Sequence, residues 1–176
     1  MFPFAPMHLL IIRHAVAEDR EAFSASGQDD DSLRPLTKAG RKKMRVAAAG
    51  LADVAPTVDV LATSPFIRAM QTADIVAAAL HRPASHTVEA LTPERPAAEF
   101  VDWMHTIDGA DVVAAVGHEP HLGRLVSWLV SARKQPFMEL SKGGACLLDL
   151  GTAPSPGTAR LVWALTAKQL RRFAED

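Results

Sequence analysis

Two ionisable side chains, Arg13 and His14, directly follow the apolar run Leu9 to Ile12. A cation at the end of such a run is costly to bury unless it has a partner, so the pair implies a bound anion. The imidazole of His14 is also a nucleophile near pH 7, since the reference pKa of histidine is about 6.5. The alternative is structural: Arg13 pairs with a carboxylate of the protein, and His14 is a buried histidine with satisfied hydrogen bonds.

Two further segments carry side chains that suit an anion. Arg68 falls in the first turn of a helix predicted to begin at Pro65, where its guanidinium and the free N–H groups of the helix start both favour negative charge. His118 follows another apolar run, where it can face the same anion as His14. Arg34, in a long polar segment, is a third candidate cation. Taken singly, each arginine is also compatible with an ordinary surface position.

Short apolar runs alternate with longer helical patterns along the chain. The runs are typical of strands buried on both faces of a sheet, and the alternation predicts a three-layer α/β/α sandwich with a mostly parallel central sheet. In such a sheet ligands bind beyond the carboxyl ends of the strands, which is where the candidate residues fall. The predicted strands cover residues 7–12, 58–62, 112–116 and 145–150, with an edge strand at 159–165. The predicted helices cover residues 37–54, 65–81, 97–105, 120–132 and 167–174.

Two helix starts are marked by capping residues. Thr37 stands where an N-cap is needed, and Ser64-Pro65 offers a capping hydroxyl followed by proline at the first helical position. Residues 17–35, which are polar and contain three consecutive aspartates, are predicted to form a surface loop.

Length and composition predict a single-domain soluble protein. The 176 residues fit one domain, expected over residues 7–176 after a tail at 1–6. With 19 Lys and Arg against 20 Asp and Glu, no binding of nucleic acid or anionic lipid is expected. No apolar stretch approaches the roughly 20 residues of a membrane span. The single Cys146 and the lack of a charged signal segment favour the cytoplasm. The sequence indicates no oligomeric state, and a monomer is compatible with it.

Four segments, in their order and spacing, resemble the histidine phosphatase superfamily, and the nearest branch is that of the small SixA-type protein phosphohistidine phosphatases. The resemblance runs from about residue 7 to 150. It implies a phosphoglycerate mutase-like fold and hydrolysis of a phosphoryl group through a covalent phosphohistidine, without a metal or another cofactor. The segments are Ile12-Arg13-His14-Ala15, Arg34-Pro35-Leu36-Thr37, Ser64-Pro65 through Arg68-Ala69 to Gln71-Thr72-Ala73, and Gly117-His118-Glu119-Pro120.

By this resemblance His14 is the nucleophile. Arg13, Arg34, Arg68 and His118 form the phosphate pocket, where they spread positive charge over the phosphoryl oxygens. The resemblance thus makes all five residues parts of one catalytic site.

The resemblance also implies a general acid after the third strand, for which Glu94 is the first candidate by position, before Glu89 and Glu99. A phosphohistidine substrate relaxes this need, because an imidazole leaving group carries its own protonation site. Only 49 residues separate Arg68 from His118, which leaves no room for a large lid. A phosphorylated protein is therefore favoured as the partner over a small phosphorylated substrate.

Three other functions stay open. One is a small-molecule phosphomonoesterase of the same superfamily. Another is a non-catalytic phosphate-binding module, although retention of both His14 and His118 exceeds what binding needs. The third is a metal hydrolase that uses His118, Glu119 and His121, whose spacing suits a zinc helix poorly. The basic run from Lys38 to Arg45 is interpreted as a solvated helix face rather than a nucleic-acid site.

Overall fold

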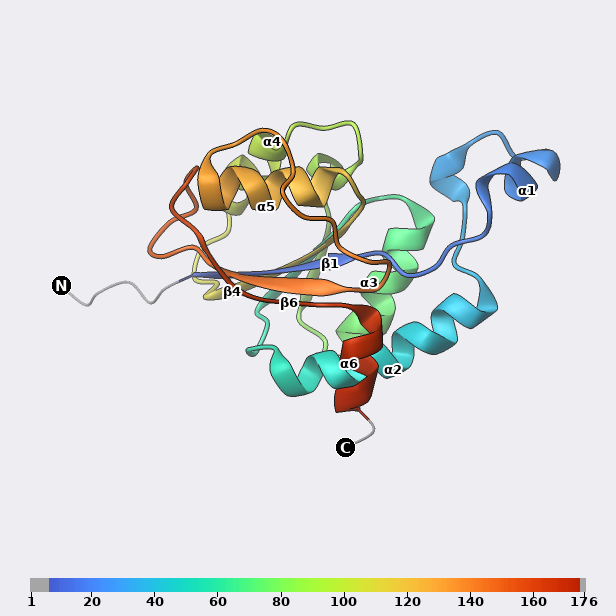
Figure 1. Cartoon of the computed structure of the whole chain (residues 1–176), viewed down its shortest axis with the longest axis horizontal. Coiled ribbons are helices and arrows are strands. Elements are labelled where there is room, and N and C mark those ends of the chain that lie inside the picture. Colours follow the sequence, from blue (N-terminus) through green and yellow to red (C-terminus); the bar gives the residue numbers. More distant parts are fainter. Residues whose placement is uncertain (1–6, 175–176) are drawn as a thin grey trace.

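Residues 7–174, which the structure describes, form one six-stranded sheet between two layers of helices in this computed structural model (Figure 1). The strands are β1 (His8–Arg13), β2 (Val60–Thr63), β3 (Ala84–Thr87), β4 (Val112–Gly117), β5 (Ala145–Asp149) and β6 (Arg160–Leu165). The helices are α1 (Arg20–Ala25), α2 (Lys38–Val54), α3 (Ile67–Ala79), α4 (Ala97–Met104), α5 (His121–Ser131) and α6 (Ala167–Phe173). Two 3₁₀ turns lie at Asp31–Leu33 and Glu89–Leu91.

The strand order is β3-β2-β4-β1-β5-β6. Strands β1 to β4 are parallel, whereas β5 runs antiparallel to β1 and β6 runs antiparallel to β5. Alternate residues of the central strand β1 pack into two separate cores. Leu9 and Ile11 join the core under α4 and α5, and Leu10 and Ile12 join the core with α2, α3 and α6 (Figure 1). The predicted three-layer, mostly parallel α/β/α sandwich is confirmed.

The parallel strands end at one edge of the sheet, and their ends lie in register. Arg13 pairs with Gly117, the N–H of His14 donates to the carbonyl of Gly117 at 3.0 Å, and the N–H of Ser64 donates to the carbonyl of Val116 at 3.0 Å. Three segments far apart in the sequence therefore leave the sheet side by side.

The predicted N-cap of α2 is confirmed, since Oγ1 of Thr37 accepts the N–H of Gly40 at 2.8 Å. Gly40 permits a close approach, because a Cβ at this position would overlap the carbonyl oxygen of Val16. The first turn of α2 therefore packs directly against the chain that follows His14.

The predicted start of α3 is wrong. The helix begins at Ile67 rather than at residue 65, and its N-cap, Phe66, makes no side-chain hydrogen bond to the helix. The hydroxyl of Ser64 instead lies 2.8 Å from Nε2 of His118 and accepts the N–H of Phe66 at 3.3 Å. Ser64 thus serves the neighbouring strand end rather than a helix cap.

An edge strand and a short helix were not predicted from the sequence. Strand β3 lacks an apolar pattern because all four of its residues are exposed. Helix α1 and the first 3₁₀ turn lie in the predicted loop 17–35 and bury no residue; they start at the capping residues Asp19 and Asp30. Figure 1 shows this segment projecting at one end of the molecule. Hydrophobic periodicity cannot reveal elements that have no buried face.

The edge strand β6 and helix α6 form as predicted, and Thr166 and Gln169 make a capping box at the start of α6. The predicted tail at residues 1–6 lies outside the described residues. Within residues 7–174, no helix combines the length and the apolar character needed to cross a membrane.

Candidate active site

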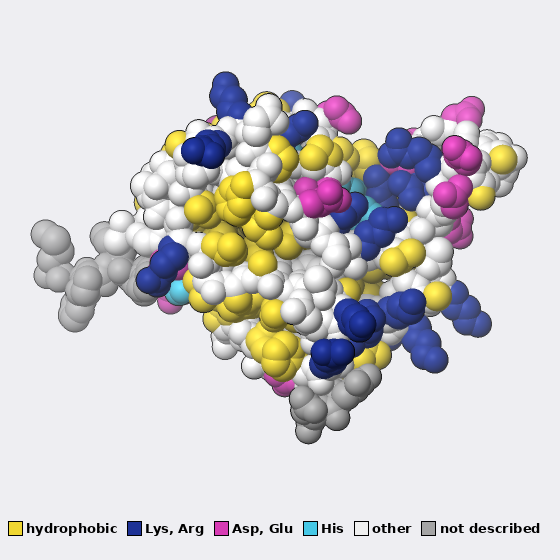
Figure 2. Space-filling model, in the orientation of Figure 1, with side chains coloured by type: hydrophobic (Ala, Val, Ile, Leu, Met, Phe, Trp, Pro, Cys, Tyr) yellow, Lys and Arg dark blue, Asp and Glu magenta, His cyan; other side chains and the backbone are white. Residues whose placement is uncertain are grey.

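A cavity of about 570 Å³ lies where β1, β2 and β4 end. All six residues of the predicted site line it, including Arg34 from the long polar segment. Figure 2 shows histidine together with Lys and Arg side chains in a recess beside the α1 segment. The full lining is Arg13, His14, Arg20, Asp31, Arg34, Phe66, Arg68, Pro93, Glu94, His118, Glu119, Pro120 and Lys142.

The ring of His14 is held in one tautomer. Its Nδ1 lies 2.7 Å from the carbonyl oxygen of Ala15. Because a carbonyl can only accept, Nδ1 carries the proton and Nε2 keeps its lone pair. Burial lowers the pKa of His14 to about 4 against the opposing effect of this hydrogen bond, and the charges of Arg68 and Arg13 lower it further. The ring is therefore neutral at pH 7, with Nε2 as its nucleophilic nitrogen.

The backbone around His14 is fixed by three other segments. Gly143, in the loop before β5, donates its N–H to the carbonyl of His14 at 3.1 Å. The N–H of Ala15 donates to Oγ1 of Thr72 at 3.0 Å, and the Thr72 hydroxyl donates to the carbonyl of Arg68 at 2.7 Å. Together with the bond to β4, these contacts join the nucleophile to the same helix turn that carries the arginine.

His118 is buried beside His14, with 5.1 Å between the two ring centroids. Its Nε2 contacts the hydroxyl of Ser64, and a Ser64 hydroxyl that donates to Nε2 leaves Nδ1 as the protonated ring nitrogen. Burial lowers the pKa of His118, and His14 and Arg68 lower it further. The ring is neutral in the free protein, whereas the resemblance to the family implies a positive charge on it. Its contribution is a hydrogen-bond donor.

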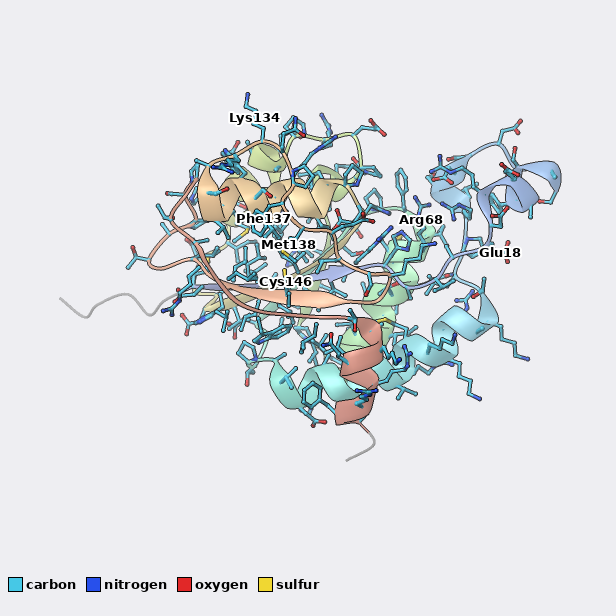
Figure 3. All side chains as sticks on the ribbon, viewed as in Figure 1. Glu18, Arg68, Lys134, Phe137, Met138 and Cys146 are labelled. Atoms are coloured by element: carbon cyan, nitrogen blue, oxygen red, sulfur yellow. The ribbon has the colours of Figure 1, made fainter. Side chains whose placement is uncertain are left out.

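Arg68 is the second residue of α3, and only 3% of it is exposed. Its Nη1 donates to the carbonyl oxygen of Asp31 at 2.7 Å, and its Nη2 lies 3.0 Å from Oδ2 of the same residue. The guanidinium carbon lies 5.0 Å from the ring centroid of Phe66. Figure 3 shows Arg68 between α3 and the α1 segment. These contacts use the Nη end of the guanidinium and leave Nε without a partner.

Arg13 follows the same pattern. Its Nη1 donates to the carbonyl of Leu140 at 2.6 Å and to Oε1 of Glu139 at 3.0 Å, while its buried Nε has no hydrogen-bond partner. Arg13 was also considered as the partner of a structural carboxylate. It does pair with Glu139, but the Glu139 side chain is 70% exposed, so this alternative is met only in part. An exposed ion pair of this kind contributes little to stability.

The carboxylate of Asp31 forms ion pairs with three arginines. Asp31 was not predicted from the sequence to be a site residue. Its carboxylate lies 2.8 Å from Nε of Arg34, 3.0 Å from Nη2 of Arg68 and 3.3 Å from Nε of Arg20. Burial raises the pKa of Asp31, but the hydrogen bond from Arg34 and the charge of Arg68 outweigh it and leave the pKa below its usual value. The spacing of Asp31 and Arg34, three residues apart, was the available signal. The contact with Arg68 required the fold.

Three buried side-chain nitrogens without a hydrogen-bond partner belong to residues that line the cavity. Within residues 7–174 all such nitrogens are Arg13 Nε, Arg68 Nε, His118 Nδ1 and both ring nitrogens of His121. The first three belong to cavity-lining residues that form hydrogen bonds within the protein through other side-chain nitrogens. A buried donor without a partner costs roughly 1–3 kcal/mol. Such an arrangement suits an oxyanion, whose oxygens accept the missing hydrogen bonds.

Of the three candidate acids, Glu94 is exposed and lines the cavity beside Pro93. Glu99 forms an ion pair with Arg95 at 3.5 Å, and neither Glu99 nor Glu89 lines the cavity. The structure therefore brings Glu94 to the site and leaves the other two away from it.

Glu119 has a structural task beside the cavity. Its two carboxylate oxygens accept the backbone N–H groups of Leu140 at 2.9 Å and Gly123 at 3.0 Å. In the part of the chain that the structure describes, no group of three or more His, Cys, Asp or Glu side chains is placed to hold a metal ion. The metal-hydrolase alternative, built on His118, Glu119 and His121, lacks a ligand set there.

The sequence matches the family model of the histidine phosphatase superfamily (branch 1) over residues 9–93. The phosphohistidine phosphatase SixA of Escherichia coli K12 is 30% identical over 146 residues, which cover 81% of this chain and 86% of that protein. The structure of the protein histidine phosphatase SixA complexed with tungstate has a TM-score of 0.78 at 24% identity, over 93% of this chain and 99% of that one. The alpha-ribazole phosphatase of Shigella flexneri, 16% identical, has a TM-score of 0.70 over 92% and 97% of the two chains.

The fold is that of the phosphoglycerate mutase-like proteins, as the structural similarity to SixA confirms. The chain belongs to the histidine phosphatase superfamily. The resemblance carried by the four sequence segments is confirmed at the level of the family.

Proposed function

We propose that this protein is a protein phosphohistidine phosphatase of the SixA type that acts through a phosphorylated His14 and needs no metal. The proposal depends chiefly on the hydrogen bond from Nδ1 of His14 to the carbonyl of Ala15. This bond places the ring proton on Nδ1 and leaves Nε2 as the nucleophile, while burial keeps the ring neutral in an arginine-rich cavity. The relationship to SixA of Escherichia coli, and the tungstate oxyanion bound in a SixA structure, support the same function.

The proposed reaction has two displacement steps. In the first, the Nε2 lone pair of His14 forms a bond to phosphorus while the P–N bond to the substrate histidine breaks. The leaving imidazole keeps the electron pair and takes up a proton. In the second, water attacks phosphorus, the bond from Nε2 to phosphorus breaks, and the water proton is released with the phosphate. One water is consumed, and histidine and inorganic phosphate are formed.

The surrounding residues have separate proposed roles in these steps. Arg13, Arg34 and Arg68 bind the phosphoryl oxygens and stabilise the charge on them in the transition state. His118 donates a hydrogen bond from Nδ1 to the same group. The carbonyl of Ala15 stabilises the positive charge that the ring of His14 acquires as it is phosphorylated.

A substrate on a protein surface suits the way the cavity is enclosed. Of residues 69–117, which join the two halves of the site, only Pro93 and Glu94 line the cavity. This stretch is taken up by α3, β3, a 3₁₀ turn, α4 and β4 rather than by a substrate lid. For an ester substrate, Glu94 is the proposed proton donor to the alkoxide. A phosphohistidine needs this donor less, because its leaving nitrogen accepts a proton directly.

The test is a parallel assay of a phosphohistidine-bearing protein, phosphoramidate and p-nitrophenyl phosphate, with and without EDTA. We expect kcat/KM at least about tenfold higher for the P–N substrates than for the ester, a difference of about 1.4 kcal/mol in activation free energy. EDTA should leave the rates unchanged, and vanadate should inhibit them. Quenching in alkaline denaturant should trap a phosphoenzyme that is stable to base and labile to acid.

Each alternative function predicts a different result. Faster hydrolysis of a small ester than of P–N substrates would identify a small-molecule phosphomonoesterase. Tight phosphate binding without turnover or phosphoenzyme would identify a non-catalytic module. Loss of activity in EDTA, restored by a divalent metal, would contradict metal independence.

Replacing Asp31 with asparagine is expected to lower kcat/KM for phosphoramidate about tenfold, mainly through kcat. The substitution keeps the side-chain size but removes the charge that orients Arg34 and Arg68, so the two guanidinium groups repel each other and shift. Steady-state kinetics measures the effect, and thermal unfolding checks the fold. Asp31→Glu should recover part of the activity.

The matched control is Asp30→Asn, one residue earlier in the same 3₁₀ turn. Asp30 caps that turn by accepting the N–H of Ser32, and asparagine can make the same cap. This control should keep the wild-type rate. Tighter vanadate binding by the Asp31→Asn variant would contradict the positioning role, because it would show that the carboxylate competes with the phosphoryl group.

A further inference from the structure

Nine of the 13 Lys and Arg side chains that form no ion pair within residues 7–174 belong to α2, α6 and the loop before β5. Within residues 7–174 the six ion pairs use Arg13, Arg20, Arg34, Arg68, Arg95 and Arg160 as cations. None uses a cation of α2 or α6, or Lys142 in the loop before β5. These unpaired residues are Lys38, Arg41, Lys42, Lys43, Arg45, Lys142, Lys168, Arg171 and Arg172. Figure 2 shows Lys and Arg side chains over α2 and α6, below the recess of the site.

Three of these cations meet at one hollow, which we call the basic hollow. Lys43 of α2, Lys142 and Arg171 of α6 line it together with Ala15 and Val16, the two residues that follow His14. Lys142 also lines the catalytic cavity. The basic hollow therefore adjoins the site and shares a side chain with it.

The size of the basic hollow limits what it can hold. Its volume is about 40 Å³, which is room for a few water-sized groups. A carboxylate fits this space, whereas a nucleotide or an extended peptide does not. An anionic side chain that reaches in from another molecule therefore matches both the size and the charge.

The charge of the basic hollow is local. The whole chain has a formal net charge of −1, so its three cations do not reflect a generally basic protein. Like charges that share one small space repel each other, and an incoming anion relieves that repulsion. The basic run from Lys38 to Arg45 is predicted from its spacing to be a solvated helix face. For Lys43 the structure gives a different setting, because residues distant in the sequence add two cations beside it.

We propose that the basic hollow binds a carboxylate on the acidic surface of a phosphorylated partner protein while the phosphohistidine of that partner enters the catalytic cavity. This inference rests on the proposed function and specifies the chemistry of its protein substrate. Complementary charge beside a reactive site speeds encounter and fixes the orientation of the partner. A small phosphoramidate gains nothing from it, because it does not reach beyond the cavity.

The test compares two charge-reversal variants on two substrates. Lys43→Glu with Arg171→Glu alters the basic hollow but leaves the cavity residue Lys142 in place. Arg133→Glu with Lys134→Glu makes the same change in net charge at exposed positions after α5, away from the basic hollow. The substrates are an acidic phosphohistidine-bearing protein and phosphoramidate, and kcat/KM is measured from low to high NaCl.

We expect the Lys43/Arg171 variant to lose about ten- to a hundredfold in kcat/KM on the protein substrate and to keep the wild-type value on phosphoramidate. High salt should lower the wild-type rate on the protein substrate and narrow the gap between the two enzymes. The Arg133/Lys134 variant should stay close to wild type on both substrates.

Equal rates for the two double variants on the protein substrate would overturn the inference. So would an equal loss on both substrates, because the cations would then act on the catalytic site itself. A wild-type enzyme that hydrolyses no phosphohistidine protein would instead contradict the proposed function, whether or not it hydrolyses phosphoramidate. The two failures are distinct, because the inference is tested by comparing variants on a protein that the wild-type enzyme does hydrolyse.

Discussion

Replacing His14 with alanine should abolish turnover and the phosphoenzyme together, lowering kcat by at least about a thousandfold. The hydrogen bond to Ala15 makes Nε2 of His14 the nucleophilic nitrogen, and the other cavity histidine, His118, has its Nε2 engaged by Ser64. No second imidazole in the cavity is therefore placed to take over the reaction. The measurement combines steady-state rates on phosphoramidate with labelling from a radioactive phosphohistidine substrate, quenched in alkaline denaturant so that a phosphohistidine survives.

The control for this variant is His105→Ala. His105 is exposed at the end of α4 and does not line the cavity, so its loss should leave both rate and labelling unchanged. Thermal unfolding should show that the His14 variant is folded, and it should still bind vanadate through the arginines. A labelled phosphoenzyme in the His14 variant would place the nucleophile elsewhere.

Replacing Arg68 with alanine should lower kcat/KM about a hundred- to a thousandfold, equivalent to ~2.7–4 kcal/mol of transition-state stabilisation. The guanidinium is buried and held at its Nη end by Asp31, so its Nε edge is already placed when charge develops on the phosphoryl group. The enzyme should remain active, because Arg13 and Arg34 stay in place. A phosphoenzyme should still form, only more slowly. Arg68→Lys should recover little, since an ammonium group cannot bind Asp31 and substrate with the same geometry.

Arg95→Ala is the matched control for this loss. Arg95 is exposed, pairs with Glu99 and does not line the cavity, so the same truncation there should leave kcat/KM unchanged. If the Arg68 variant were as active as the Arg95 variant, the phosphate-binding role of Arg68 would be wrong. Vanadate inhibition constants measured in parallel would show whether the loss lies in oxyanion binding.

The main residues of the candidate site could be named from sequence for a physical reason. Arg13 and His14 directly follow an apolar run, where a buried charge is costly unless it has a partner. The rule that ligands bind at the carboxyl ends of parallel strands then places His118 and the start of α3 at the same edge. The structure brings these residues and Arg34 to one cavity. Their spacing along the chain also carried the resemblance to the family.

Asp31 and Ser64 show where sequence reasoning failed. Asp31 lies among three consecutive aspartates in a polar segment, a pattern typical of a solvated loop. Its contact with Arg68 spans 37 residues, and no local pattern indicates it. Ser64 has the sequence context of a helix cap, yet its hydroxyl contacts His118 across 54 residues. In both cases the side chain contacts a residue that is distant in the sequence, rather than taking the local role that its residue type suggests.

By itself, the amino-acid order determined the layered architecture and the types of side chain available for catalysis, because apolar periodicity and strand ends are local properties of a chain. Tertiary structure alone decided which end of each functional side chain is anchored and which nitrogen stays unpaired. It also decided that Lys43, Lys142 and Arg171 share one hollow beside His14. These outcomes depend on hydrogen bonds and charges between segments that become neighbours only after the sheet has formed.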